Sequence, residues 1–199
     1  MKIVLPQELR RKFFHLFTFL YVLVYAAAGK NVSLWIFGTF LLVAAAGEAV
    51  RLRSPAANAA LMKLFRGIHR AEEQHRPSGI LWTALGVFLV VLFVPYPDVV
   101  ITALCYLAVG DTAAALVGRT WGHLRIGGKS MEGSLACFLA CWLTGSLTLA
   151  SPFGSVELIV GALVATLAEI LPLPLGDNLW VPVLSGAALS LLRLTVSPF

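Results

Sequence analysis

The sequence predicts an all-α integral membrane protein with about seven transmembrane helices, and two observations carry that prediction. Of its 199 residues, 59% are hydrophobic and only 13% are charged, about half the charged fraction of a soluble domain. The hydrophobic residues form continuous runs close to the roughly 20 residues that an α-helix needs to span a bilayer, not the alternating segments of a β-barrel. We therefore expect a single membrane-embedded domain over residues 1–199.

Seven apolar runs are separated by segments that stop a helix. Glycine, proline and asparagine mark the breaks, as in "GKN" after the first run, "PYP" after the third and "LPLPLGDN" before the seventh. The first run resembles a signal peptide, but it is long enough to span and further spans follow, so we interpret it as a retained helix. The predicted spans are residues 13–29, 32–50, 79–95, 98–118, 131–150, 156–172 and 178–195.

Basic residues predict the orientation, because cytoplasmic loops carry an excess of lysine and arginine. Every lysine and arginine except Lys30 and Arg193 lies in the N-terminal tail or in the loops that follow the second and fourth spans. The N-terminus is therefore predicted to be cytoplasmic and the C-terminus outside, in the plasma membrane if the protein is prokaryotic. Residues 57–70 have an apolar face with basic residues largely off it, which predicts an interfacial amphipathic helix, either a plain connector or an entry element for a lipid.

Acidic residues gather at the predicted cytoplasmic side. Asp111 is the deepest, about two turns inside the fourth span, where a charge costs roughly 2.5–3.5 kcal/mol and needs a partner. Gly110 beside it lets another helix or a ligand come close. We expect a magnesium ion, which prefers carboxylate oxygens, to be bound by Asp111, Asp177, Glu132 and Glu169. The alternative for Asp111, Asp177 and Glu169, and also for Glu48, is that these acids pair with nearby arginines and hold the bundle together.

The stretch "GHLRIGGKSMEGS", residues 122–134, is similar to the end of a phosphate-binding P-loop. The match fails, because the first glycine is one residue out of register and no strand is expected before the loop. Its chemistry still suits phosphate. Gly127 and Gly128 let the backbone approach an anion, Lys129 adds a positive charge, and Ser130 can cap the helix that follows. The alternative is a basic loop that only sets topology.

A second basic segment, "ELRRKFFHL", precedes the first span. Arg11 and His15 share a helix face there, and topology alone would not need the histidine, so we expect a functional role. Arg119 adds positive potential on the same side of the membrane. The three cysteines lie inside apolar runs, which indicates small apolar side chains and not a disulfide framework or a metal site.

Four segments occur in order along the chain: "RKFFH" at 11–15, "GDTAAALVG" at 110–118, "GGKSMEGS" at 127–134 and "EILPLPLGDNLWVP" at 169–182. Together they resemble a family of membrane lipid kinases that contains dolichol kinase, phytol kinase and the CTP-dependent diacylglycerol kinase of yeasts. This family is related to the phosphatidate cytidylyltransferases, whose long C-terminal signature has no match here.

The resemblance implies that CTP donates a phosphoryl group to a membrane lipid alcohol, either an isoprenoid alcohol or diacylglycerol. The nucleotide-binding residues it implies, together with those expected from their charge, are Gly127, Gly128, Lys129, Ser130, Asn178, Arg119 and Arg11. The expected catalytic residues are Asp111, Lys129, Glu132 and His15. Two alternatives stay open, a CDP-lipid synthase of the cytidylyltransferase type and a non-catalytic transporter or subunit. No nucleic-acid partner is expected, and small residues at 44–47 leave a homodimer open.

Overall fold

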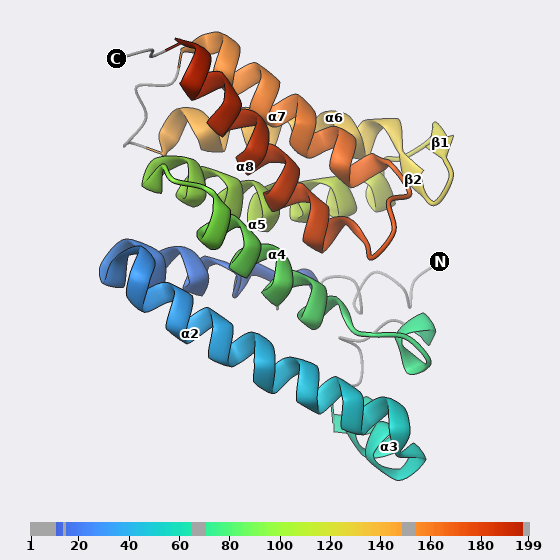
Figure 1. Cartoon of the computed structure of the whole chain (residues 1–199). Coiled ribbons are helices and arrows are strands. Elements are labelled where there is room, and N and C mark those ends of the chain that lie inside the picture. The colour runs from blue at the N-terminus through green and yellow to red at the C-terminus, as the bar shows by residue number, and fades with distance from the viewer. Residues whose placement is uncertain (1–10, 14, 65–70, 149–153, 197–199) are drawn as a thin grey trace.

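The computed structural model describes residues 11–13, 15–64, 71–148 and 154–196, and this part of the chain is almost entirely helical (Figure 1). The only strands within these ranges, β1 (Arg125–Ile126) and β2 (Lys129–Ser130), form one short hairpin. The all-α prediction is otherwise confirmed for these residues. The helices are α2 (Phe19–Arg53), α3 (Pro55–Leu64), the 3-10 turn η1 (Ala71–Gln74), α4 (Gly79–Phe93), α5 (Pro97–Thr120), α6 (Met131–Leu147), α7 (Ser155–Ile170) and α8 (Asp177–Val196).

Helix α2 consists of two helical halves joined at Gly29. This residue has φ 71° and ψ 177°, a positive φ that glycine adopts without steric cost. The chain reverses direction there, which brings residues before and after Gly29 together. The Tyr21 ring meets the Phe37 ring edge-on at 5.1 Å between centroids and the Phe40 ring at 6.1 Å. The break expected between the first two apolar runs is therefore present, and we call this pair of halves the α2 hairpin.

Helix α5 lies at the centre of the bundle and packs against α2, α4, α6, α7 and α8. Its contact with α6 is made of small residues. A Cβ atom added to Gly110 would lie 2.6 Å from Cys141 Sγ and 3.1 Å from Cys137 Sγ, and one added to Gly133 would lie 2.6 Å from the Ala114 carbonyl oxygen. Because a carbon atom does not fit at such distances, the α5–α6 contact depends on these glycines. The close approach expected at Gly110 is confirmed.

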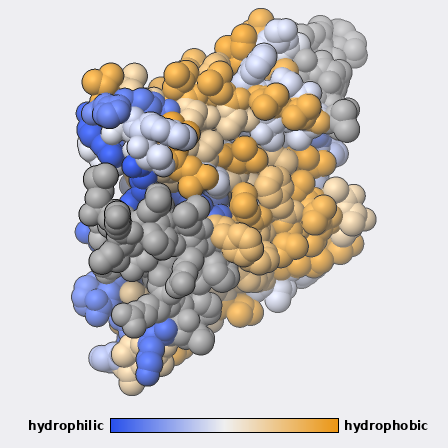
Figure 2. Space-filling model, turned by 180° about the vertical axis from the view of Figure 1, so that it is seen from behind, coloured by the Kyte–Doolittle hydropathy of each residue, from blue (hydrophilic) through white to orange (hydrophobic). Residues whose placement is uncertain are grey.

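Apolar side chains cover much of the outside of the bundle. Figure 2 shows hydrophobic residues over most of the visible described surface, with the most hydrophilic ones toward one edge. Among the outermost are Trp35, Leu42 and Phe93. Helices α2, α5 and α8 are long and apolar enough to cross a membrane, and α4 and α6 are shorter apolar helices. A surface of this kind suits a membrane protein, while the seven spans and their orientation stay predictions.

A buried arginine joins α2 to α3, to η1 and to the segment before α4. Arg51 is only 2% exposed, and its guanidinium donates to both carboxylate oxygens of Glu48. It also donates to Asn58 Oδ1 at 3.0 Å and to the backbone oxygens of Glu73 at 2.8 Å and Arg76 at 2.7 Å. A buried charge is tolerated only when it is paired and hydrogen-bonded in this way. For Glu48, the alternative expectation, an acid that pairs with an arginine and holds helices together, is the one observed.

The predicted interfacial helix corresponds to α3, which begins two residues earlier than expected, at Pro55. Residues 65–70 of that prediction lie outside the described part of the chain. Within the described part, Lys63 is exposed and Leu61 and Met62 are half-buried, as expected for an amphipathic helix.

The end of the bundle near Gly29, here called the Gly29 end, holds a few separate polar contacts. Lys30 Nζ donates to the Val94 carbonyl oxygen at 3.0 Å, which attaches the α2 hairpin to the end of α4. Arg193 of α8 pairs with Asp98 at the start of α5. Glu157 accepts the Gly154 backbone N–H at 2.7 Å and caps α7. Each acid at this end therefore has one structural contact that accounts for it.

Candidate functional site

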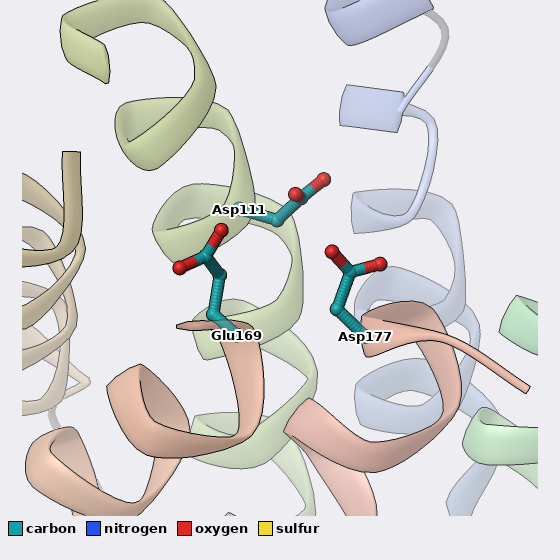
Figure 3. A group of neighbouring side chains, drawn as sticks. All are labelled: Asp111, Glu169 and Asp177. Carbon is teal, nitrogen blue, oxygen red and sulfur yellow. The ribbon is translucent and has the colours of Figure 1, made fainter. Parts of the chain in front are cut away.

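Three carboxylates from three helices meet at the other end of the bundle, here called the acidic end. They are Asp111 of α5, Glu169 in the last turn of α7 and Asp177 at the first residue of α8 (Figure 3). One oxygen from each lies within 4.8 Å of the others. Asp111 and Glu169 are almost completely buried. The structure thus brings together three of the four acids expected to bind magnesium.

Two lysines pair with the carboxylates of this cluster. Lys12 pairs with Asp111, and both side chains are less than 10% exposed. Lys129 pairs with Asp177 at 2.7 Å and with Glu169 at 2.9 Å, and it also donates to the Glu169 backbone oxygen. The pair with Lys12 gives Asp111 the partner that its burial requires. The alternative expectation was pairing with arginines, and the partner observed is a lysine.

The charge on Lys129 is stabilised by its neighbours. Partial burial lowers the pKa of its ammonium group, but the carboxylates of Asp177 and Glu169 outweigh that effect and raise the pKa above its usual value. Its side chain is 31% exposed, so that it remains accessible from the solvent. Lys129 is therefore a permanent cation that touches the cluster and also faces outward.

His15 lies on the same side of the cluster as Lys12. Its Nε2 atom is 3.3 Å from Asp111 Oδ2 and 3.0 Å from the Leu107 backbone oxygen. Since both neighbours are hydrogen-bond acceptors, Nε2 carries the proton in this arrangement. The other ring nitrogen, Nδ1, is then the one able to accept a proton.

The loop between α5 and α6 differs from the expectation that no strand precedes the glycines. Arg125 pairs with Ser130 and Ile126 with Lys129 across an antiparallel hairpin, and Gly127 turns the chain with φ 59°. The hairpin is too short to resemble the α/β setting of a P-loop, so the rejection of that motif stands. Its role in this structure is to carry Lys129 back to the cluster.

Ser130 caps α6 as expected. Its Oγ accepts the Gly133 backbone N–H at 3.1 Å, and the side chain is buried. Gly118 and Gly122 surround this hydroxyl so closely that an added Cβ atom would lie 2.7 Å and 2.6 Å from it. The cap therefore fixes where α6 begins and with it the position of the hairpin, while contact of Ser130 with a nucleotide stays a prediction.

Glu132 is not brought into the cluster of three carboxylates. Its Oε1 atom accepts the backbone N–H groups of His123 at 2.9 Å and Leu124 at 3.1 Å. These bonds tie the hairpin to the first turn of α6. In this arrangement Glu132 holds the loop in place. The segment "KSMEGS" indicated an acid at a helix end. It could not show that the backbone N–H groups of the loop would donate to this carboxylate.

The remaining predicted nucleotide-binding residues are spread around the acidic end. Asn178 donates to the Gly79 backbone oxygen at 3.3 Å and so joins α8 to α4. Arg11 and Asn178 both line the large cavity described below. Arg119, Gly127 and Gly128 are exposed on the hairpin side and lie outside that lining. The structure thus divides the predicted set into two groups on different sides of the carboxylates.

A cavity of about 1020 Å³ opens beside the cluster. Its polar part contains Lys12, His15, Asp111 and Asp177, and its apolar part is lined by residues of the α2 hairpin and α4. Glu169 and Lys129 are not among the lining residues. Two of the three acids therefore face a large, mostly apolar cavity, and the third faces the hairpin.

Sequence reasoning missed Lys12 as a site residue. The sequence places Lys12 among the basic residues before the first span, and the predicted site takes only Arg11 and His15 from that segment. Lys12 and His15 are three residues apart, which also places them on one helix face, and both contact Asp111. Glu73 and Arg76 line the cavity as well. They belong to the segment "EEQHRPSG", residues 72–79, which the sequence indicates as a second patch of the same kind as "ELRRKFFHL".

The fold and the site together define a class of protein: a helical membrane protein with a carboxylate–lysine cluster at one end and a large amphiphilic cavity beside it. Comparison with known proteins shows that the chain is a homologue of CTP-dependent lipid kinases, which confirms the resemblance. No family model matches the chain, and no solved structure matches it.

Three relatives are described as CTP-dependent diacylglycerol kinase 1. The chain is 29% identical to the protein of Saccharomyces cerevisiae over 212 aligned residues, which cover 92% of this chain and 72% of the relative. It is 29% identical to that of Schizosaccharomyces pombe over 164 residues, covering 73% of this chain and 74% of the relative. A shorter match to the Eremothecium gossypii protein reaches 39% identity over 95 residues, 46% of this chain and 30% of the relative.

Proposed function

We propose that this protein is a CTP-dependent kinase that phosphorylates the hydroxyl group of a membrane lipid alcohol at the cytoplasmic face. The observation that carries the proposal is the position of the carboxylate cluster. Asp111 and Asp177 line the amphiphilic cavity, whereas Glu169 and Lys129 flank the same cluster outside that lining. Such a site can receive a lipid from one side and a nucleotide from the other.

The three carboxylates fit a magnesium ion. Glu169 Oε2 is buried and has no hydrogen-bond partner among the described residues, although a buried carboxylate oxygen normally has one. It therefore has a lone pair available for a cation. Asp111, Asp177 and Glu169 would hold the ion, and Glu132 would support the loop. Held there, magnesium would supply positive charge that offsets the negative charge of the phosphates.

Lys129 is suited to the nucleotide phosphates, because it is cationic, partly exposed and carried by a glycine turn. In phosphoryl transfer the protein mainly positions the reactants and stabilises charge. Lys129, with Arg119 and the backbone at Gly127 and Gly128, would hold the phosphates of CTP at the hairpin. Ser130 keeps α6 and the hairpin in register. Arg11 and Asn178 line the cavity beside the carboxylates and would reach only the phosphate end of the nucleotide, where it meets the lipid hydroxyl.

The acceptor hydroxyl would lie near Asp111 and His15. Its oxygen forms a new bond to the γ-phosphorus of CTP while the bond between that phosphorus and the leaving CDP oxygen breaks. The hydroxyl proton passes to a base, either His15 through Nδ1 or a carboxylate of the cluster. The product is a lipid phosphate. The description of the relatives as diacylglycerol kinases favours diacylglycerol as the acceptor, and an isoprenoid alcohol has the same reacting group.

The test is transfer of label from γ-labelled CTP to lipid alcohols by the purified protein in lipid vesicles with magnesium. We expect a labelled lipid phosphate and CDP. Release of pyrophosphate with formation of a CDP-lipid from a phosphorylated lipid would overturn the proposal in favour of a cytidylyltransferase. No transfer to diacylglycerol, a polyprenol or a phytol-like alcohol would overturn it as well.

A further inference from the structure

The apolar part of the cavity has three walls. Tyr21 and Val24 come from the first half of the α2 hairpin, Ile36 and Phe37 from its second half, and Ile80 and Trp82 from α4. The reversal at Gly29 places the two α2 walls next to each other, as the ring contact between Tyr21 and Phe37 shows. An apolar compartment of this kind is continuous with the polar part at Asp111 and His15.

The rim of this compartment is apolar. Leu20, Ile36, Phe40 and Ile80 line the cavity and are 42–54% exposed, whereas Phe37 on the inner wall is 2% exposed. An apolar rim that faces water is unfavourable at about 25 cal/mol per Å² of exposed apolar surface. The same rim facing lipid chains carries no such penalty. We therefore take this opening to face the bilayer.

The compartment is shallow. On the first half of α2 and the turn before it, the lining residues run from Phe17 to Val24, about two helical turns or roughly 10 Å. The hydrocarbon core of a bilayer is about 30 Å thick. Beyond Val24, the α2 hairpin is closed by Tyr25 and Ser33, which are 3% and 0% exposed. Val24 on the first half and Ile36 on the second half are the lining residues nearest to Gly29 in the sequence.

From these observations we infer that Val24 and Ile36 are specificity-determining residues of a compartment for the hydroxyl-proximal part of one lipid tail. They form its end nearest Gly29, here called the deep end, where Ile36 also borders the lateral opening. The occupant is a lipid alcohol of the cytoplasmic leaflet, and the rest of its tail leaves through the apolar rim into the bilayer. This inference rests on the proposed function. It identifies the hydroxyl-proximal part of one tail as the part of the acceptor that the protein recognises.

Binding can be measured without nucleotide, metal or turnover. Trp82 lines the compartment, and bromine atoms on a lipid chain quench the fluorescence of a tryptophan that they contact. The protein in vesicles would be titrated with diacylglycerol brominated in the upper part of its chains and, separately, with phosphatidylcholine carrying the same chains. A Trp82→Phe variant isolates the contribution of Trp82 from that of the other tryptophans. We expect the diacylglycerol to quench Trp82 at least twofold more strongly than the phosphatidylcholine.

The deep end is tested with Val24→Phe and, on the opposite wall, Ile36→Phe. Leu23→Phe is the matched control, because Leu23 is 63% exposed and is not a lining residue. We expect Val24→Phe and Ile36→Phe each to remove most of the preference of Trp82 for brominated diacylglycerol. They should also lower the ratio of rates for long-chain over short-chain diacylglycerol at least fivefold. Leu23→Phe should change neither quantity.

The outcomes separate this inference from the proposed function. Selective quenching without any CTP-dependent phosphorylation would support the compartment and overturn the kinase. Phosphorylation with equal quenching by both brominated lipids would overturn the compartment, since the cavity would then hold bulk lipid. An unchanged rate ratio in both Val24→Phe and Ile36→Phe, with each variant folded by its fluorescence spectrum, would overturn it too.

Discussion

The two ends of the bundle contain the same kinds of charged side chain but use them differently. At the Gly29 end, Asp98 pairs with Arg193 and Glu157 caps α7, so each acid has a contact that accounts for it. At the acidic end, three carboxylates share two lysines. Among the described residues, one buried oxygen of Glu169 and one of nearby Glu132 are left without a hydrogen bond. A charge pair that only holds helices together is balanced, whereas a site for a cation keeps an excess of acceptors.

The comparison is tested most strongly by Asp111→Asn against Asp98→Asn. Removing one charged group that stabilises a transition state typically costs about 10²- to 10³-fold in rate, so Asp111→Asn should lose at least that much phosphoryl transfer from CTP. Asp98→Asn should keep its rate within about threefold, because its contact with Arg193 is remote from the site. Initial rates with labelled CTP measure both. Equal losses in the two variants would mean that both acids are merely structural.

Lys129→Met tests the cation on the hairpin side. A hydrogen bond to a charged group contributes about 1.5–3 kcal/mol, so this variant should bind CTP about 10- to 100-fold more weakly. Equilibrium dialysis with labelled CTP and magnesium measures the affinity directly. Arg193→Met is the control at the Gly29 end and should bind CTP as the unmodified protein does. Unchanged affinity in Lys129→Met would remove this residue from the nucleotide site.

Magnesium should stabilise the folded protein through the acidic end. At a concentration ten times its dissociation constant, a ligand that binds only the folded state adds about 1.4 kcal/mol. Thermal unfolding with and without magnesium should show this increment in the unmodified protein and in Asp98→Asn. Glu169→Gln should abolish it. An increment that survives in Glu169→Gln would place the cation elsewhere.

The smallest effect is expected at Gly29 itself. Its positive φ is unfavourable for any residue with a Cβ atom, and Gly29→Ala should destabilise the protein by about 1 kcal/mol, although the added methyl group has no neighbour within 4 Å. Unfolding in mild detergent measures the loss, and CTP-dependent activity at low temperature should be unchanged. A large loss of activity would show that the two ends are coupled.

Much of the fold was predictable because it depends on short-range patterns. The helix break at Gly29, the cap at Ser130 and the small residue at Gly110 are each signalled by a residue type whose local chemistry is specific. The assembly of Asp111, Glu169 and Asp177 was also expected, because acids in apolar helices avoid lipid and therefore face the interior of the bundle. What the sequence could not settle is competition between partners. Glu132 was equally able to join the acids or to accept the loop's amides.

The same limit applies to Lys12. Three neighbouring basic residues precede the first apolar run, and their order in the chain does not show which one reaches a carboxylate on another helix. That choice depends on how α5 is rotated about its axis, which the packing of Gly110 against Cys137 and Cys141 fixes. The rotation is a property of the assembled bundle. It has no signal within the N-terminal segment itself.

The reversal at Gly29 also has a consequence for how the chain folds. Contacts such as Tyr21–Phe37 join residues that are close in sequence, and contacts of this kind form quickly because little loop-closure entropy opposes them. The α2 hairpin can therefore assemble early, while the pair between Lys12 and Asp111 joins residues 99 positions apart and must wait for α5. The two α2 walls of the cavity are then in place before the charged end of the cavity is complete. A nascent chain therefore forms the lipid-facing part of the protein first and the carboxylate–lysine cluster last.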